Sequence, residues 1–115
     1  MKHLAGLSVL VLGLGESGLA MAAWCARHGA RVRVWDSREA PPQAPALTLA
    51  APAATRFSGT LDAASLQGVQ LVLKSPGLAP HDQRVAALLA AARAQGIAVQ
   101  GERDLFTHAL DELRN

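Results

Sequence analysis

Three glycines stand between an apolar run and a helix-like segment near the start of the chain, and they constrain its fold more than any other feature. Leu7 to Leu12 reads LSVLVL, a short run rich in leucine and valine that is typical of a strand buried on both faces. The motif GLGESG follows at residues 13–18, and Glu16 to His28 then has small and apolar residues on one face. A G-x-G-x-x-G pattern between a strand and a helix is typical of a nucleotide-binding turn in a Rossmann-like fold.

Each glycine of this motif has a physical role in such a turn. Gly13 permits the tight turn, Gly15 lets a phosphate approach the backbone, and Gly18 lets the helix pack closely on the strand. The N–H groups and the dipole at the helix start favour a bound diphosphate, and Ser17 could add a hydroxyl donor. Glu16 suits a first helical turn but would repel phosphate, so we expect its side chain to point away. The alternative is that the glycines make a tight turn and bind nothing.

The rest of the chain alternates between strand-like and helix-like segments. Strands are predicted at Arg31–Trp35, Thr55–Phe57, Gln70–Lys74 and Ile97–Gln100, and helices at Leu61–Leu66 (with Thr60 as N-cap), Asp82–Gln95 and from about Arg103. The proline- and alanine-rich segment Glu39–Ala53 is expected to be a surface loop with room for a short helical piece. This alternation predicts one α/β domain, residues 1–115. It has a doubly wound, parallel five-stranded sheet in the order 3-2-1-4-5, with helices on both faces.

Polar residues follow two further strands of this predicted sheet. Asp36 ends the second strand, where an acid accepts hydrogen bonds from a ribose in dinucleotide-binding folds; Arg38 could stack on a base or pair with phosphate. The alternative is an ordinary polar turn. The segment KSPG, residues 74–77, ends the fourth strand, and Lys74 either neutralises phosphate charge or faces solvent. Because the fourth strand lies beside the first, we expect GLGESG and KSPG to face each other across one crevice.

Composition argues against several other classes of function. The net charge is +2 with scattered basic residues and few aromatic ones, so no nucleic-acid partner is expected. No apolar stretch reaches the roughly 20 residues that span a bilayer, and no signal peptide is recognised, so we expect no membrane partner and a cytoplasmic location. The single cysteine, Cys25, is expected to be a packing residue. No metal site is expected, because no metal-ligand spacing links His3, His28, His81 and His108.

Four segments together resemble one protein family. VLGLGESGLA, the strand end WDSR, LVLKSPGL and GIAVQGERDLF are similar to the N-terminal domain of the UDP-N-acetylmuramoyl-L-alanine–D-glutamate ligases, within the Mur ligase family. The resemblance runs from about Leu7 to Leu110. The S-P-G and G-E-x-x-L-F segments make it more specific than the glycine loop alone.

This resemblance implies a role in bacterial peptidoglycan synthesis, and through it in cell shape and division. In the family, the first domain holds the UDP part of the substrate, a central domain binds ATP and Mg²⁺, and the last domain receives D-glutamate. By resemblance, UDP-N-acetylmuramoyl-L-alanine is held at its diphosphate by Gly15, Glu16, Ser17 and Gly18, at its uridine end by Asp36, Ser37 and Arg38, and at the opposite wall by Ser75, Pro76 and Gly77. The chain is then expected to be a UDP-binding fragment of an ATP-dependent ligase. It is expected to have no cofactor site or catalytic residue of its own, and to be inactive without the missing ATP-binding domain.

Two other functions stay open on the sequence. The first is an NAD-binding module, regulatory or cut from a dehydrogenase, because the glycine loop, helix start and strand-end acid are common to both. KSPG distinguishes them: a dinucleotide lays its second nucleotide across that crevice, whereas a UDP-sugar leaves it toward a neighbouring domain. The second is a structural domain without a ligand, against which the clustered glycines argue.

Overall fold

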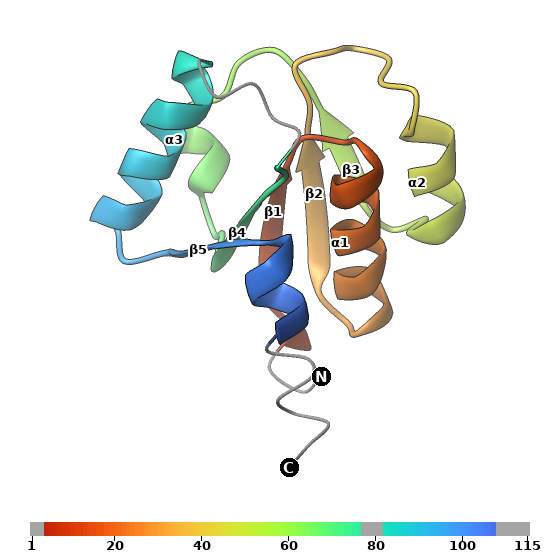
Figure 1. Ribbon diagram of the computed structural model, residues 1–115. Coiled ribbons are helices and arrows are strands. Elements are labelled where there is room, and N and C mark those ends of the chain that lie inside the picture. Colours follow the sequence, from red (N-terminus) through yellow and green to blue (C-terminus); the bar gives the residue numbers. More distant parts are fainter. Residues whose placement is uncertain (1–3, 77–81, 108–115) are drawn as a thin grey trace.

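A five-stranded parallel sheet forms the centre of the molecule, with helices on both faces (Figure 1). The computed structural model describes residues 4–76 and 82–107. The strands are β1 (Ser8–Leu12), β2 (Arg31–Trp35), β3 (Thr55–Phe57), β4 (Leu71–Lys74) and β5 (Ala98–Gly101). They are arranged in the order β3-β2-β1-β4-β5, and every neighbouring pair is parallel. The predicted fold class and strand order are therefore confirmed.

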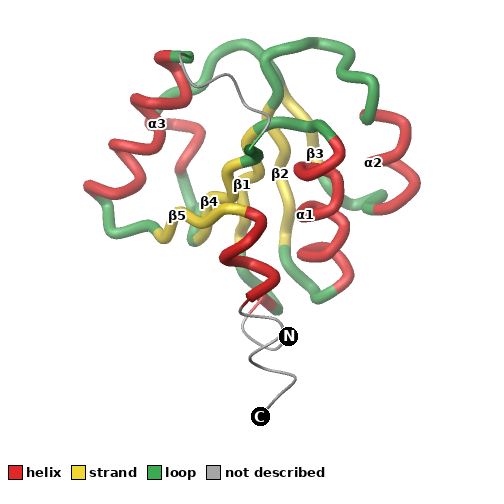
Figure 2. The backbone as a smooth tube through the Cα atoms, in the orientation of Figure 1, coloured by secondary structure: helices red, strands yellow, loops and turns green. Residues whose placement is uncertain are grey.

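The helices divide into two layers (Figure 2). One face of the sheet carries α1 (Glu16–Arg27), α2 (Ala44–Ala50) and a helix at residues 102–107. The other face carries the 3₁₀ helix η2 (Ala63–Leu66) and α3 (Gln83–Ala94). The continuation of the last helix beyond residue 107 lies outside the described residues.

The central strand β1 contributes to both hydrophobic cores. Val9 and Val11 pack toward α1 and α2, whereas Leu10 and Leu12 pack toward α3 and η2, and all four side chains are buried. Successive side chains of a strand point to opposite faces, so a strand covered on both faces needs a continuous apolar run. This burial explains LSVLVL and fixes where the chain leaves the sheet for the glycine loop.

One segment agrees with the sequence-based expectation of a short helical piece, and another differs from its prediction. Within the proline-rich stretch, α2 buries Leu47 against the α1 side of the sheet, and Pro45 lies in its first turn, where a missing N–H costs little. The N-cap of the helix after Leu61 is Asp62, so the prediction of Thr60 is wrong. Asp62 accepts a hydrogen bond from Ala64 N at 3.1 Å, and its own N–H donates to Ser65 Oγ at 3.3 Å. This reciprocal capping starts the helix two residues later than predicted.

The close approach of α1 to the end of β1 depends on Gly18. A Cβ atom at Gly18 would overlap the carbonyl oxygen of Gly13, which itself has φ of +93°. Gly15 differs, because its φ of −98° suits any residue and a Cβ there would meet nothing within 4 Å. Gly18 is thus required by packing, whereas Gly15 leaves open space at the start of α1.

The two glycines therefore predict opposite effects on stability. Gly18→Ala should lower the free energy of unfolding by about 3 kcal/mol, because the new methyl group displaces α1 from β1. Gly15→Ala is the matched control and should cost less than about 1 kcal/mol, since alanine is merely a poorer N-cap than glycine. Urea unfolding followed by tryptophan fluorescence measures both values, and equal losses would contradict the assigned packing role.

Candidate functional site

The carboxyl ends of three adjacent strands bring the predicted site segments together. Leu12 of β1 is level with Trp35 of β2 on one side and with Lys74 of β4 on the other. Two backbone hydrogen bonds continue this pairing beyond the strands, from Gly13 N to Trp35 O at 2.7 Å and from Ser75 N to Leu12 O at 3.0 Å. The glycine loop therefore lies between the segment after β2 and the segment after β4, as the strand order required.

The start of α1 is open toward this edge of the sheet. Gly15 is the N-cap, and no side chain within the described part of the chain caps the first-turn N–H groups. The first N–H groups of a helix have no partner within the helix, and together with the helix dipole they form a site for anions. Glu16 is exposed, and Ser17 is half-buried.

Asp36 holds the glycine loop in place. Its carboxylate is buried and accepts hydrogen bonds from Leu14 N at 2.8 Å and from Arg38 N at 2.9 Å. The Arg38 side chain adds two more, from Nε at 2.9 Å and from Nη2 at 3.0 Å. Both carboxylate oxygens are thus used inside the protein, and the outward-facing groups of this turn are Ser37 and the half-exposed guanidinium of Arg38. A contact between Asp36 and a nucleotide stays a prediction.

These contacts keep Asp36 ionised. Burial alone would raise the pKa of the carboxyl group, but the hydrogen bonds from Arg38 and Leu14 and the charge of Arg38 outweigh it. Together they lower the pKa from its usual 3.8 to about 2. The carboxylate that binds the glycine loop through Leu14 N is therefore negatively charged at neutral pH.

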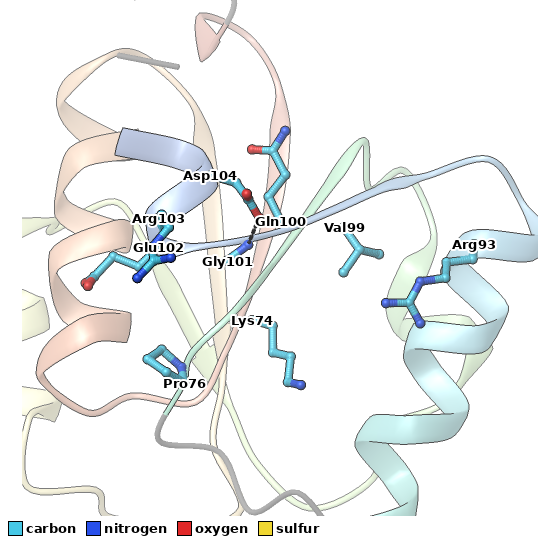
Figure 3. A pocket seen from close by; sticks show the side chains of 9 residues that line it. All are labelled: Lys74, Pro76, Arg93, Val99, Gln100, Gly101, Glu102, Arg103 and Asp104. Carbon is cyan, nitrogen blue, oxygen red and sulfur yellow. Dashed lines mark hydrogen bonds between the residues drawn. The ribbon is translucent and has the colours of Figure 1, made fainter. Parts of the chain in front are cut away.

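The segment after β4 forms the other side of the site. Ser75 is almost completely buried at 2% exposure, and Pro76 is exposed. Gly77 lies outside the described residues. The side chain of Lys74 extends, with that of Arg93, into a hollow of about 530 Å³ beside β5 (Figure 3).

Glu102 lies at this edge of the sheet and contacts Ser17, and the sequence-based reasoning did not include it among the candidate site residues. It is the first residue after β5, and its Oε2 accepts a hydrogen bond from Ser17 Oγ at 2.7 Å. The parallel pairing of β5 with β4 brings it to the same edge of the sheet as the glycine loop. Its position directly after the fifth strand was the signal that could have identified it. The segment GERDLF was interpreted only as a feature of the family and not as part of the site.

Other candidate residues have structural roles. Cys25 is fully buried, and burial raises the pKa of its thiol to about 11, which confirms its packing role. Among the described residues, no group of histidine, cysteine or acidic side chains could hold a metal ion. No helix in the described ranges is long and apolar enough to cross a membrane. Of the histidines, His28 packs against Trp24 at 4.5 Å between ring centroids, and the other three lie outside the described residues.

The strand order and the glycine turn together define a Rossmann-like α/β domain. Solved structures share the fold at low sequence identity. A precorrin-2 dehydrogenase, SirC, has a TM-score of 0.63 at 20% identity, covering 86% of this chain and 46% of its own. A shikimate dehydrogenase from Aquifex aeolicus has a TM-score of 0.56 at 20% identity, covering 86% and 43%. Identities this low show the fold alone.

Sequence comparison identifies the family. The model of the Mur ligase MurD-like N-terminal domain matches residues 7–101, so the chain belongs to this family. The UDP-N-acetylmuramoylalanine–D-glutamate ligase of Ralstonia nicotianae is 57% identical over 96% of this chain and 22% of its own length. The enzyme of the same name from Albidiferax ferrireducens is 53% identical over 99% of this chain and 22% of its own length. The chain thus spans about a fifth of the length of these ligases.

The lowered pKa of Asp36 predicts a loss of stability in acid. A carboxylate whose pKa is lower in the folded state stabilises the protein above its unfolded pKa of 3.8, and this contribution disappears as the pH falls toward 2. For wild-type protein, we expect Asp36 to account for about 2 kcal/mol of lost unfolding free energy between pH 5 and pH 2. Urea unfolding at each pH measures this loss, and the free energy of unfolding of Asp36→Asn should fall by about 2 kcal/mol less than that of the wild type over the same pH range.

Asp82 offers a matched control. It pairs with Arg84 in the same D-x-R arrangement, with Arg84 Nη2 at 2.9 Å from Asp82 Oδ2, but its side chain is more exposed, at 14% against 5% for Asp36. Asp82→Asn should therefore keep most of the acid-induced loss. Identical pH profiles for the Asp36→Asn variant and the wild type would contradict the loop-fastening role of Asp36.

Proposed function

We propose that this chain is the UDP-binding domain of an enzyme that adds D-glutamate to UDP-N-acetylmuramoyl-L-alanine. Family membership over residues 7–101 and the names of the relatives support this assignment. The observation that carries the binding role is the open start of α1, where Gly15 leaves space and no described side chain caps the helix. A diphosphate matches such a site, because its charge and its acceptor oxygens complement the helix dipole and N–H groups.

The geometry suggests how the rest of the substrate lies. With the diphosphate at Gly15, Ser17 and Gly18, the uridine extends toward Ser37 and Arg38 on the β2 side. Arg38 is held by Asp36, so its planar guanidinium is presented in one orientation to a base or ribose. The segment that begins at Ser75 closes the β4 side, and the sugar leaves the crevice toward the rest of the enzyme.

In this proposal, the chain binds substrate and other parts of the ligase perform the chemistry. ATP with Mg²⁺, bound by a separate domain, would phosphorylate the substrate carboxylate, and the amine of D-glutamate would then displace the phosphate. We expect the isolated chain to catalyse nothing, with a cytoplasmic location for the whole enzyme, where ATP and UDP-sugars are made. An NAD-binding role has weaker support, because the dehydrogenases share the fold at about 20% identity, whereas the ligases are more than 50% identical.

Ligand titration separates the two functions. Amide NMR shifts of the chain, followed with UDP-N-acetylmuramoyl-L-alanine, UDP and NAD, should change at Gly15, Ser17 and Gly77 with the two uridine ligands and not with NAD. Binding is expected to be weak, because the isolated chain lacks contacts that the rest of the enzyme provides. Shifts caused by NAD and not by UDP would reverse the assignment.

Gly15→Val tests the binding role without disturbing the fold. The backbone at Gly15 is extended, with φ of −98° and ψ of −161°, and a Cβ meets no atom within 4 Å, so valine fits the folded chain. Its side chain would occupy the space in front of the helix start, and we expect UDP affinity to fall about tenfold or more.

A second valine controls for this substitution. Ala20→Val adds a branched side chain at an exposed position of α1, beyond its first turn, and should leave UDP affinity unchanged. Calorimetric titration with UDP measures both variants. If the Gly15→Val and wild-type chains bind UDP with equal affinity, the diphosphate does not bind at the start of α1.

A further inference from the structure

The contact between Ser17 and Glu102 joins the start of α1 to the helix that follows β5. Ser17 Oγ donates to Glu102 Oε2 at 2.7 Å, a short bond of the charge-assisted kind. Figure 3 shows the side chain of Glu102 pointing toward α1 and away from Lys74 and Arg93. A carboxylate of the protein itself therefore lies beside the helix start that the proposed function assigns to a diphosphate.

This arrangement opposes a bound phosphate in two ways. A serine hydroxyl has one proton, so while Ser17 donates to Glu102 it cannot donate to a phosphate oxygen. The carboxylate also brings a negative charge to the helix start, where it repels a second anion. The helix dipole stabilises negative charge there, whether it comes from the protein or from a ligand.

We propose that Glu102 competes with the ligand diphosphate for Ser17 and so sets the affinity of this site for anions. The inference rests on the proposed function. A ligand must displace the carboxylate from Ser17 before the hydroxyl can donate a hydrogen bond to the phosphate. The free-energy cost of breaking the Ser17–Glu102 hydrogen bond therefore lowers the affinity for every anionic ligand.

The displacement involves the side chain of Glu102 and not its helix. Leu105 is fully buried in the core on the α1 side, and Phe106 packs edge-to-face on Trp24 with 5.5 Å between ring centroids. Asp104 Oδ2 accepts a hydrogen bond from Gly101 N at 3.0 Å and fixes the first turn. Glu102 is half-buried at the front of this anchored helix, so its side chain can rotate away while the backbone stays in place.

Glu102→Gln tests the proposal because it removes the charge and keeps an oxygen that can accept from Ser17. Calorimetric titration of the 115-residue chain with UDP at low ionic strength should show about fivefold tighter binding for this variant than for wild type. The gain should shrink at high salt, where charge repulsion is screened. Neutral uridine should bind both chains equally.

Asp104→Asn is the matched control, because it removes the same charge from the same helix without touching Ser17. Its UDP affinity should change less than twofold. Because a damaged fold would weaken UDP binding, tighter binding by Glu102→Gln could not be caused by a loss of structure.

The outcomes separate this inference from the function on which it rests. If Glu102→Gln binds UDP no more tightly than the wild type, while UDP still shifts the amide NMR signal of Ser17 in the wild type, the role of Glu102 is overturned and the proposed function stands. An equal gain in Asp104→Asn also overturns it, because the effect would then belong to net charge. If neither the wild type nor Glu102→Gln binds UDP, the proposed function fails and this inference fails with it.

Discussion

The contact between Gly18 and the carbonyl group of Gly13 is the constraint on which the rest of this structure depends. Because no side chain separates them, α1 begins directly against the end of the central strand. The burial of β1 on both faces fixes that strand end, and the adjacent ends of β2 and β4 lie at the same level. The position of the helix start relative to its neighbours is thus decided by packing before any ligand is considered.

Electrostatic interactions then shape what packing has positioned. The buried Asp36 fastens the glycine loop through Leu14 N and holds Arg38 outward, whereas Glu102 approaches the helix start from the opposite side through Ser17. One carboxylate therefore builds the loop, and we infer that the other regulates its access to anions. Both act on a helix start that no described side chain caps.

Most of the fold could be predicted from the sequence, because its signals are local. The limits of β2 and β3 were predicted to the residue. The predicted N-cap of η2 was wrong because threonine and aspartate are both good N-caps. The structure uses Asp62 and not Thr60, because Ser65 is placed to exchange reciprocal hydrogen bonds with Asp62. At the site, the contact of Asp36 with Leu14 and that of Glu102 with Ser17 could not be predicted, since they join residues 22 and 85 positions apart in the chain.

A crystal structure of the chain with UDP bound is the most direct test of the central claim, that the start of α1 holds a nucleotide diphosphate. The account predicts phosphate oxygens about 3 Å from backbone nitrogens of the glycine loop and the first turn of α1, with the Glu102 carboxylate moved away from Ser17. Phosphate groups bound elsewhere, for example between Lys74 and Arg93, with Ser17 still donating to Glu102, would contradict it.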